Sequence, residues 1–191
     1  MPRAGLTRDR VAAVAADLAD AGGLEALSLS AVAKQVGVSQ PALYKHVAGL
    51  DALRRDVAVL AVRELAQVLA TARADRTGRE GLVATADAYR AWAAGHPGRA
   101  AATVRAPAPG DAEHAEAARQ AVEEVLAVLR GYGEHAAVTT GGAVHAVRQF
   151  RAALHGFVTL EAAGGFGLPE SVDETFRGLV DALDLAFRAS R

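Results

Sequence analysis

Apolar residues recur along this chain at the three- and four-residue spacing of amphipathic helices rather than at the two-residue spacing of strands. Val11, Ala15 and Leu18 lie on one such face between Thr7, a residue suited to capping a helix, and Gly22. The same pattern predicts nine helices: one after Thr7, one between Ser28 and Gly37, one after Ser39, and six more over about residues 51–71, 79–94, 99–105, 111–130, 143–163 and from 171 onward.

The predicted fold class is therefore all-α. We expect a three-helix head over residues 1–50 and a body of five or six helices over residues 51–191. The clearest break in the body is the Pro-rich segment 105–110, and the hardest segment to interpret is 131–142.

Residues 28–47 carry the strongest functional pattern, a short helix, a Gly turn and a second short helix at helix-turn-helix spacing. Val32, Leu43 and Val47 are expected to form a small shared core beneath the two helices. The second helix then leaves amide, phenol and cationic side chains facing outward, which suits the base edges and phosphates of a DNA major groove. A plain helical hairpin is the alternative interpretation.

This segment resembles the DNA-binding head of the tetracycline-repressor (TetR) family. The family pattern places Ser or Thr at the cap of its second helix, Gly-Val-Ser at the turn and Leu-Tyr-x-His after it. Here these are Ser28, Gly37-Val38-Ser39 and Leu43-Tyr44-Lys45-His46. One departure is Leu50, where the family usually has a Lys that touches phosphate. Either that backbone contact is missing here, or Arg54 or Arg55 supplies it.

A second resemblance concerns the C-terminal half, which is similar to the TetR subgroup whose C-terminal domain is named WHG. It rests on His96-Pro97-Gly98 and on Leu154-His155-Gly156-Phe157-Val158. The Trp that often precedes His-Gly in that subgroup is Leu154 here.

The resemblance and the exposed polar pattern together predict the DNA-binding residues. We expect Tyr44, Lys45 and His46 to contact phosphates and Gln40 to contact a base edge, with the two capped helix N-termini facing the DNA backbone. The full predicted set is Ser28, Ser39, Gln40, Pro41, Tyr44, Lys45 and His46.

Composition and charge change this picture little. The net charge is −1, with +2 in residues 1–55 and −3 in the remainder, so the head is only mildly basic. The absence of Cys excludes disulfides and thiolate metal sites, and it fits a cytoplasmic protein. No apolar stretch is long enough to span a membrane, and no signal peptide is recognisable in the first ten residues.

Six His residues raise the question of a metal site, but none stands at a ligand spacing such as His-Glu-x-x-His. No nucleophile and base pattern is visible either. We therefore expect no metal, no cofactor and no catalytic residues.

The body is expected to hold a small hydrophobic or aromatic effector, as the resemblance implies. A largely apolar pocket with a few polar groups would suit such a ligand, although these side chains are equally compatible with a plain core. The candidates for its lining are Tyr89, Trp92, His96, Phe150 and His155.

The last two helices are expected to form a homodimer interface as a four-helix bundle, because they carry more large apolar residues than a C-terminal hairpin needs. The predicted contacts are Phe157, Leu160, Leu179, Leu183 and Phe187.

Taken with the resemblance, these features predict a dimeric transcriptional repressor that binds double-stranded operator DNA and is released by a small molecule. The alternative is a helical ligand-binding protein or enzyme that carries a vestigial helix-turn-helix.

Overall fold

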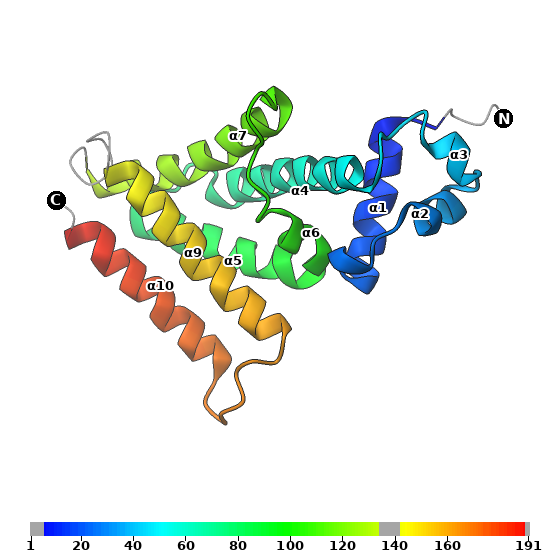
Figure 1. Ribbon diagram of the computed structural model, residues 1–191. Coiled ribbons are helices and arrows are strands. Elements are labelled where there is room, and N and C mark those ends of the chain that lie inside the picture. Colours follow the sequence, from blue (N-terminus) through cyan, green and yellow to red (C-terminus); the bar gives the residue numbers. More distant parts are fainter. Residues whose placement is uncertain (1–5, 134–141, 190–191) are drawn as a thin grey trace. The chain divides into compact units, whose positions relative to one another are not determined.

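The computed structural model describes residues 6–133 and 142–189, and all of the regular secondary structure in them is helical. Nine α-helices and two short 3-10 helices occur there and no strand does, which confirms the predicted fold class. Figure 1 labels most of them along the chain. In order they are α1 Arg8–Gly22, η1 Leu24–Ala26, α2 Leu29–Val36, α3 Gln40–Leu43, α4 Leu50–Arg73, α5 Gly78–Gly95, α6 Pro97–Ala102, α7 Ala112–Leu129, η2 Arg130–Tyr132, α9 Gly142–Ala162 and α10 Val172–Ala189.

The helix ends follow from local side-chain chemistry. The Thr7 hydroxyl accepts a hydrogen bond from the Arg10 backbone N–H at 3.2 Å, and the Ser171 hydroxyl accepts one from the Glu174 N–H at 3.3 Å. Both satisfy N–H groups that a helix start leaves without a partner. Gly23 ends α1 with φ of 88°, a conformation that favours glycine. The predicted cap at Thr7 is thus confirmed, and Ser171 caps α10 in the same way.

Two predicted helices differ in extent from the structure. The helix after Ser39 is α-helical only as far as Leu43 and continues as turns, and the short helix predicted over 99–105 is α6, Pro97–Ala102. Pro97 explains the earlier start of α6, because its fixed φ suits the first turn of a helix. Most of the segment 131–142, residues 134–141, lies outside the described residues.

The chain divides into two compact units. Unit 1 comprises Met1–Glu64 and Gly95–Ala118, and unit 2 comprises Leu65–Ala94 and Arg119–Arg191. Unit 1 thus contains the predicted head together with α6, the first part of α4 and the first turns of α7.

Unit 1 is built on α1. Val11, Ala15 and Ala19 are buried on its inner face, and α6 packs closely on the same helix. Small side chains at these positions allow neighbouring helices to approach closely. The helix that opens the predicted head is therefore also the support of α6.

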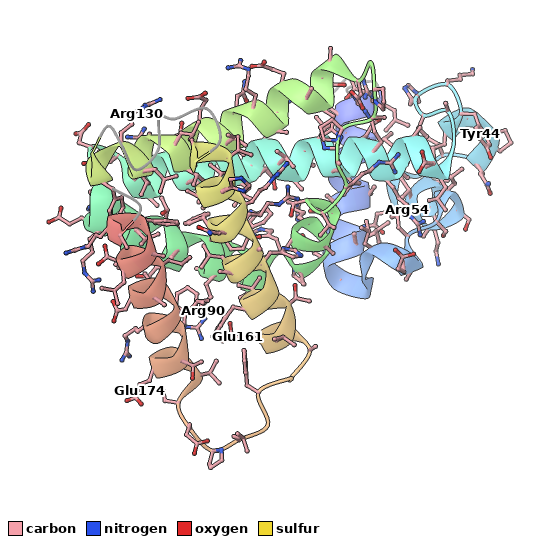
Figure 2. All side chains as sticks on the ribbon, turned by 60° about the vertical axis from the view of Figure 1, so that its left-hand side comes forward. Tyr44, Arg54, Arg90, Arg130, Glu161 and Glu174 are labelled. Carbon is pink, nitrogen blue, oxygen red and sulfur yellow. The ribbon has the colours of Figure 1, made fainter. Side chains whose placement is uncertain are left out.

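Unit 2 is held partly by the side chain of Arg90 on α5. Its guanidinium carbon lies 5.5 Å from the Phe157 ring centroid and 4.8 Å from that of Phe176, while Arg90 Nε donates to Glu161 at 2.9 Å. Figure 2 labels Arg90 and Glu161, whose side chains lie next to each other. Arg90 Nη1 also lies 2.8 Å from a carboxylate oxygen of Asp173. One cation thus contacts two aromatic rings and two carboxylates, which links α5 to α9 and α10.

Candidate functional site

The turn of the helix-turn-helix is closed by backbone hydrogen bonds. Gly37 has the left-handed φ of 75°, its N–H bonds to the Lys34 carbonyl at 3.2 Å, and the Val38 N–H bonds to the Ala33 carbonyl at 3.0 Å. This is the Schellman arrangement, in which a C-terminal glycine satisfies the last carbonyls of a helix. The predicted role of Gly37 is confirmed, and the turn sets the direction in which α3 leaves α2.

The two short helices share a core, as the sequence predicts. Val32, Leu43 and Val47 are each at most 5% exposed, and Val38 is half-buried beside them. The buried residues fix the faces of both helices, so the remaining positions of α3 and the following turn are directed to the surface.

The two predicted capping serines behave differently. The Ser28 hydroxyl accepts from the Ala31 N–H at 3.3 Å and lies 3.2 Å from the Ser30 hydroxyl. Ser39 occupies the cap position of α3 but makes no capping hydrogen bond through its side chain. The chain after α3 stays wound through bonds from the His46 and Val47 N–H groups to the Leu43 carbonyl, at 2.9 and 3.1 Å.

The residues predicted to face DNA are gathered on this segment. Gln40, Pro41, Tyr44 and Lys45 are exposed and His46 is half-buried. Tyr44, labelled in Figure 2, is 54% exposed, which is unusual for a large aromatic side chain. Within the described part of the chain, the side chains of Gln40, Tyr44 and Lys45 have no hydrogen-bond or ion-pair partner. They are therefore available to an external ligand.

The two arginines considered as replacements for the usual Lys near position 50 both have carboxylate partners. Arg55 donates to Asp111 at 2.8 Å through Nε and to Glu113 at 2.6 Å through Nη1. Arg54 is only 30% exposed and reaches Glu25 at 3.2 Å. Arg54 is the better placed of the two for an external phosphate, because its carboxylate partner is itself highly exposed.

Unit 1 also holds a buried charge cluster that the sequence did not indicate. The Arg99 backbone N–H donates to Asp20 at 2.8 Å, and its guanidinium donates to Asp17 at 2.7 Å and also to Asp20. Its Nε lies 3.1 Å from Glu64 without hydrogen-bond geometry. Burial lowers the pKa of Arg99, but the hydrogen bond to Asp17 and the nearby carboxylates outweigh it, so the pKa is raised. Arg99 stays charged and joins α6 to α1 and α4.

The candidates for an effector site lie partly together. The Tyr89 hydroxyl is 3.1 Å from His155 Nδ1, and the Tyr89 and Trp92 rings meet edge to face with centroids 6.4 Å apart. Phe150 is also buried in unit 2, whereas His96 belongs to unit 1. Burial, and then the charge of Arg151, lower the pKa of His155, which favours the neutral imidazole.

The residues predicted for the dimer interface are divided by the structure. Phe157, Leu183 and Phe187 are buried within unit 2; Phe187 packs edge to face on Tyr132 at 5.8 Å. They pack in the core of this unit and are at most 8% exposed, so they offer little area to a second copy, and their part in a dimer interface stays a prediction. Leu160 is 52% exposed, and Leu179 is half-buried.

A different set of residues on α9 and α10 is exposed and small or apolar. We call it the small-residue face: Gly156, Leu160, Gly178, Ala182 and Leu185. A Cβ added to Gly156 or Gly178 would meet no atom within 4 Å. Gly156 and Leu160 are four residues apart on α9, and on α10 Ala182 follows Gly178 by four residues and precedes Leu185 by three. These spacings place the residues of each helix on one stripe of its surface.

Two further properties bear on the class of protein. No helix among the described residues is long and apolar enough to cross a membrane. No group of three or more His, Cys, Asp or Glu that could hold a metal ion occurs in residues 6–133 and 142–189.

Comparison with known proteins agrees with this architecture. Residues 12–57 match the model for bacterial regulatory proteins of the tetR family, and residues 82–183 match the tetracyclin repressor-like C-terminal domain. An uncharacterized HTH-type transcriptional regulator of Mycobacterium tuberculosis, Rv0681, is 37% identical over 83% of this chain and 72% of its own.

Two solved structures extend the likeness. A protein of unknown function from Rhodococcus sp. RHA1 superposes with a TM-score of 0.77 at 26% identity, covering 97% of both chains. A TetR variant from Acinetobacter baumannii in complex with minocycline gives 0.66 at 23% identity, covering 97% of this chain and 98% of that one. The second likeness concerns the fold alone. The family matches and the Mycobacterium tuberculosis relative, taken with the helix-turn-helix geometry, place this chain in the TetR family of helix-turn-helix transcriptional regulators, a family without enzymatic activity.

Proposed function

We propose that this regulator is a repressor that binds operator DNA as a homodimer and is released by a small apolar effector. The observation that carries the proposal is a set of exposed side chains without partners on and after α3, which follows the hydrogen-bonded turn at Gly37: Gln40, Tyr44 and Lys45. The predicted division into a head over residues 1–50 and a body over residues 51–191 stays part of the proposal.

Each side chain of the head would have its own part in DNA binding. Gln40 opens α3, where its amide would pair with an adenine edge, and Lys45 and Tyr44 would reach phosphates on either side. His46 is half-buried and would contribute a shorter contact. Ser28 already serves as a cap, so its contribution would be to position the N-terminus of α2 near the DNA backbone.

The dimer would form through the small-residue face of α9 and α10. Glycine and alanine on a helix surface let a second backbone approach closely, and Leu160 and Leu185 would supply the apolar area. This arrangement keeps the predicted helices but replaces the buried Phe157, Leu183 and Phe187 with residues of the opposite face.

The effector would bind in unit 2 around Tyr89, Trp92 and His155. Aromatic faces and a neutral His suit a hydrophobic or aromatic molecule better than a charged one. The minocycline complex of the Acinetobacter baumannii protein is consistent with a ring-bearing ligand in this family. We also propose that the C-terminal domain is of the WHG type, since Gly98 and the Leu154–Val158 stretch follow its pattern.

Release of DNA would require the effector to favour a conformation in which the two heads no longer match their half-sites. α4 and α7 contribute residues to both units, so they would carry the change. A regulator acting on DNA in this way would work in the cytoplasm.

The test is a mobility-shift titration of the full chain on the intergenic DNA beside its own coding region. We expect a specific complex whose affinity is at least about tenfold lower for Lys45→Ala. We also expect the complex to dissociate at the concentrations at which a cognate effector quenches the fluorescence of the single Trp92. Binding no tighter than to random DNA of equal length would contradict the proposal. If a molecule changes the Trp92 fluorescence saturably and the DNA complex stays intact, only the proposal of effector-induced release is contradicted.

A further inference from the structure

A cleft of about 290 Å³ lies in unit 1 between α1, α4 and α7, away from the residues assigned above to DNA or effector. Its volume is near the lower end of the range for small-molecule sites, about 300–1,000 Å³. Its floor is apolar, formed by Ala12, Val59 and Leu60. Ala12 and Val59 are buried and Leu60 is half-buried.

The walls carry both signs of charge. Arg8 is engaged, because its Nε and Nη2 donate to Asp56 at 2.7 and 2.5 Å, and Nη2 also reaches Glu113 at 3.1 Å. Arg63 makes one longer bond, from Nη2 to Glu113 at 3.2 Å. Its Nε and Nη1 have no partner among the described residues.

The lining of the cleft also includes a carboxylate that has no partner. Asp9 lines the cleft from the first turn of α1 and is exposed. It makes no hydrogen bond or ion pair within the described residues. The cleft thus offers one largely free guanidinium and one free carboxylate above an apolar floor.

We propose that this cleft binds a small zwitterion with an apolar body, of the amino-acid type. The ligand's carboxylate would accept hydrogen bonds from Arg63, its ammonium would donate to Asp9, and its apolar part would cover Ala12 and Val59. A simple anion would bring its charge beside Asp9 and Glu113, and a simple cation would bring its charge beside Arg8 and Arg63. A dipolar ligand pairs its negative end with an arginine and its positive end with a carboxylate. The cleft would therefore select such a ligand over a simple anion or a simple cation.

Occupancy would hold α1 to α4 and α7, because the cleft is lined by residues of all three helices. This site goes beyond the proposed effector site: it lies in the other unit and takes a ligand of different chemistry. Its test uses no DNA, so its outcome is independent of the proposed repressor function.

The experiment titrates the full chain with L-leucine and two analogues that each lack one charge. 4-Methylpentanoate lacks the ammonium and isopentylamine lacks the carboxylate. Saturation-transfer NMR and calorimetry are carried up to millimolar concentration. We expect saturable binding of L-leucine and binding at least about tenfold weaker for both analogues, as loss of one charge-assisted contact implies.

Three variants locate the binding. Arg63→Gln and Asp9→Asn should each weaken L-leucine binding at least about tenfold, whereas Arg10→Gln, an exposed arginine of α1 outside the cleft, should leave it unchanged. Both altered side chains are at the surface, and thermal unfolding of each variant establishes that it is folded. Absence of saturable binding, equal binding of 4-methylpentanoate, or equal loss in Arg10→Gln would each overturn the proposal.

Discussion

Gly98 at the start of α6 lies directly against the Ala19 carbonyl group at the end of α1, so close that a Cβ on Gly98 would come within 3.0 Å of the backbone there. The contact places Arg99 where its backbone N–H donates to Asp20. The His96-Pro97-Gly98 sequence therefore has a structural explanation: Pro97 starts the helix and Gly98 allows the approach.

Gly98→Ala should destabilise unit 1. The added methyl group meets backbone atoms, which cannot move aside as a flexible side chain can, so we expect a loss of about 1–3 kcal/mol or more in the free energy of unfolding. Chemical denaturation measures it. Gly95→Ala is the matched control, since a Cβ there meets nothing within 4 Å. Equal stability of the two variants would contradict the close packing of α6 on α1.

Arg99→Met should also be destabilising, for an electrostatic reason. It leaves Asp20, which is 13% exposed, without its cation partner, although Asp17 at 71% exposure can return to water. We expect a loss of about 2–4 kcal/mol, toward the lower part of the range for broken buried pairs. Arg130→Met removes an exposed pair with Glu123 and should cost less than about 1 kcal/mol. A loss for Arg99→Met no larger than this control would show that the buried cluster adds nothing.

His114 predicts a pH dependence of stability. It is 1% exposed, and neither ring nitrogen has a hydrogen-bond partner. Burial is the main cause that lowers its pKa; the charges of Arg55 and Arg105 act in the same direction, and Asp111 and Glu113 oppose them. The folded chain therefore resists protonation of this imidazole.

The sign follows from proton uptake. As the pH falls through about 6.5, the unfolded chain binds a proton at His114 before the folded chain does, so stability decreases with a slope of up to about 1.4 kcal/mol per pH unit. His155, whose pKa is also lowered, adds in the same direction. The pKa of Asp111 is lowered chiefly by the Arg55 hydrogen bond. Carboxylates of this kind change the pH dependence of stability only below about pH 4.

Urea unfolding at several pH values between 7 and 5 tests this prediction. His114→Leu keeps an apolar side chain in the buried position and should reduce the slope, with His155 supplying what remains. A slope identical to that of the wild type would mean that His114 titrates normally when folded.

The helix-turn-helix could be predicted from sequence because its determinants are local. Ser28, Gly37 and the buried Val32, Leu43 and Val47 act within about twenty residues of one another, and each lies where the pattern placed it. The extent of α3 could not be predicted in this way, because no side chain there marks the change from α-helix to turn.

Contacts between distant segments were not accessible to the same reasoning. Nothing near Arg99 in the sequence indicates Asp17 and Asp20, which lie 82 and 79 residues earlier. The apolar faces of α9 and α10 were identified, but periodicity alone does not tell a face directed to the unit's own core from one directed to a partner. Large residues such as Phe187 occupy the core, and small ones such as Gly178 remain outside.

The small-residue face predicts which substitutions separate dimers. Ala182→Arg places a long charged side chain on an exposed stripe and should produce folded monomers that bind operator DNA weakly, because one head contacts one half-site. Sedimentation and mobility shift measure the two effects. Val122→Arg on α7 is the control and should remain dimeric.

Leu183→Arg provides a contrast on the same helix. Leu183 is 8% exposed, so a buried arginine without a partner should lower the melting temperature of the unit itself rather than dissociate a dimer. If Leu183→Arg is stable and monomeric and Ala182→Arg is dimeric, the dimer interface is formed by the face that includes Leu183, as the sequence predicts, and not by the small-residue face.

Gln40 and Lys45 should separate specificity from affinity. Lys45 is exposed and unpartnered, and its role is electrostatic, so Lys45→Ala should weaken binding to every DNA sequence and lower the log–log salt slope by about one. Gln40→Ala should instead cost about 1–3 kcal/mol on the operator and little on random DNA, with the salt slope unchanged, because an amide releases no counterions. Fluorescence anisotropy at several salt concentrations, on operator and on random duplexes, distinguishes the two. If both variants lose affinity equally on both duplexes, Gln40 contacts the backbone rather than a base, and specificity must come from another side chain or from the shape of the DNA.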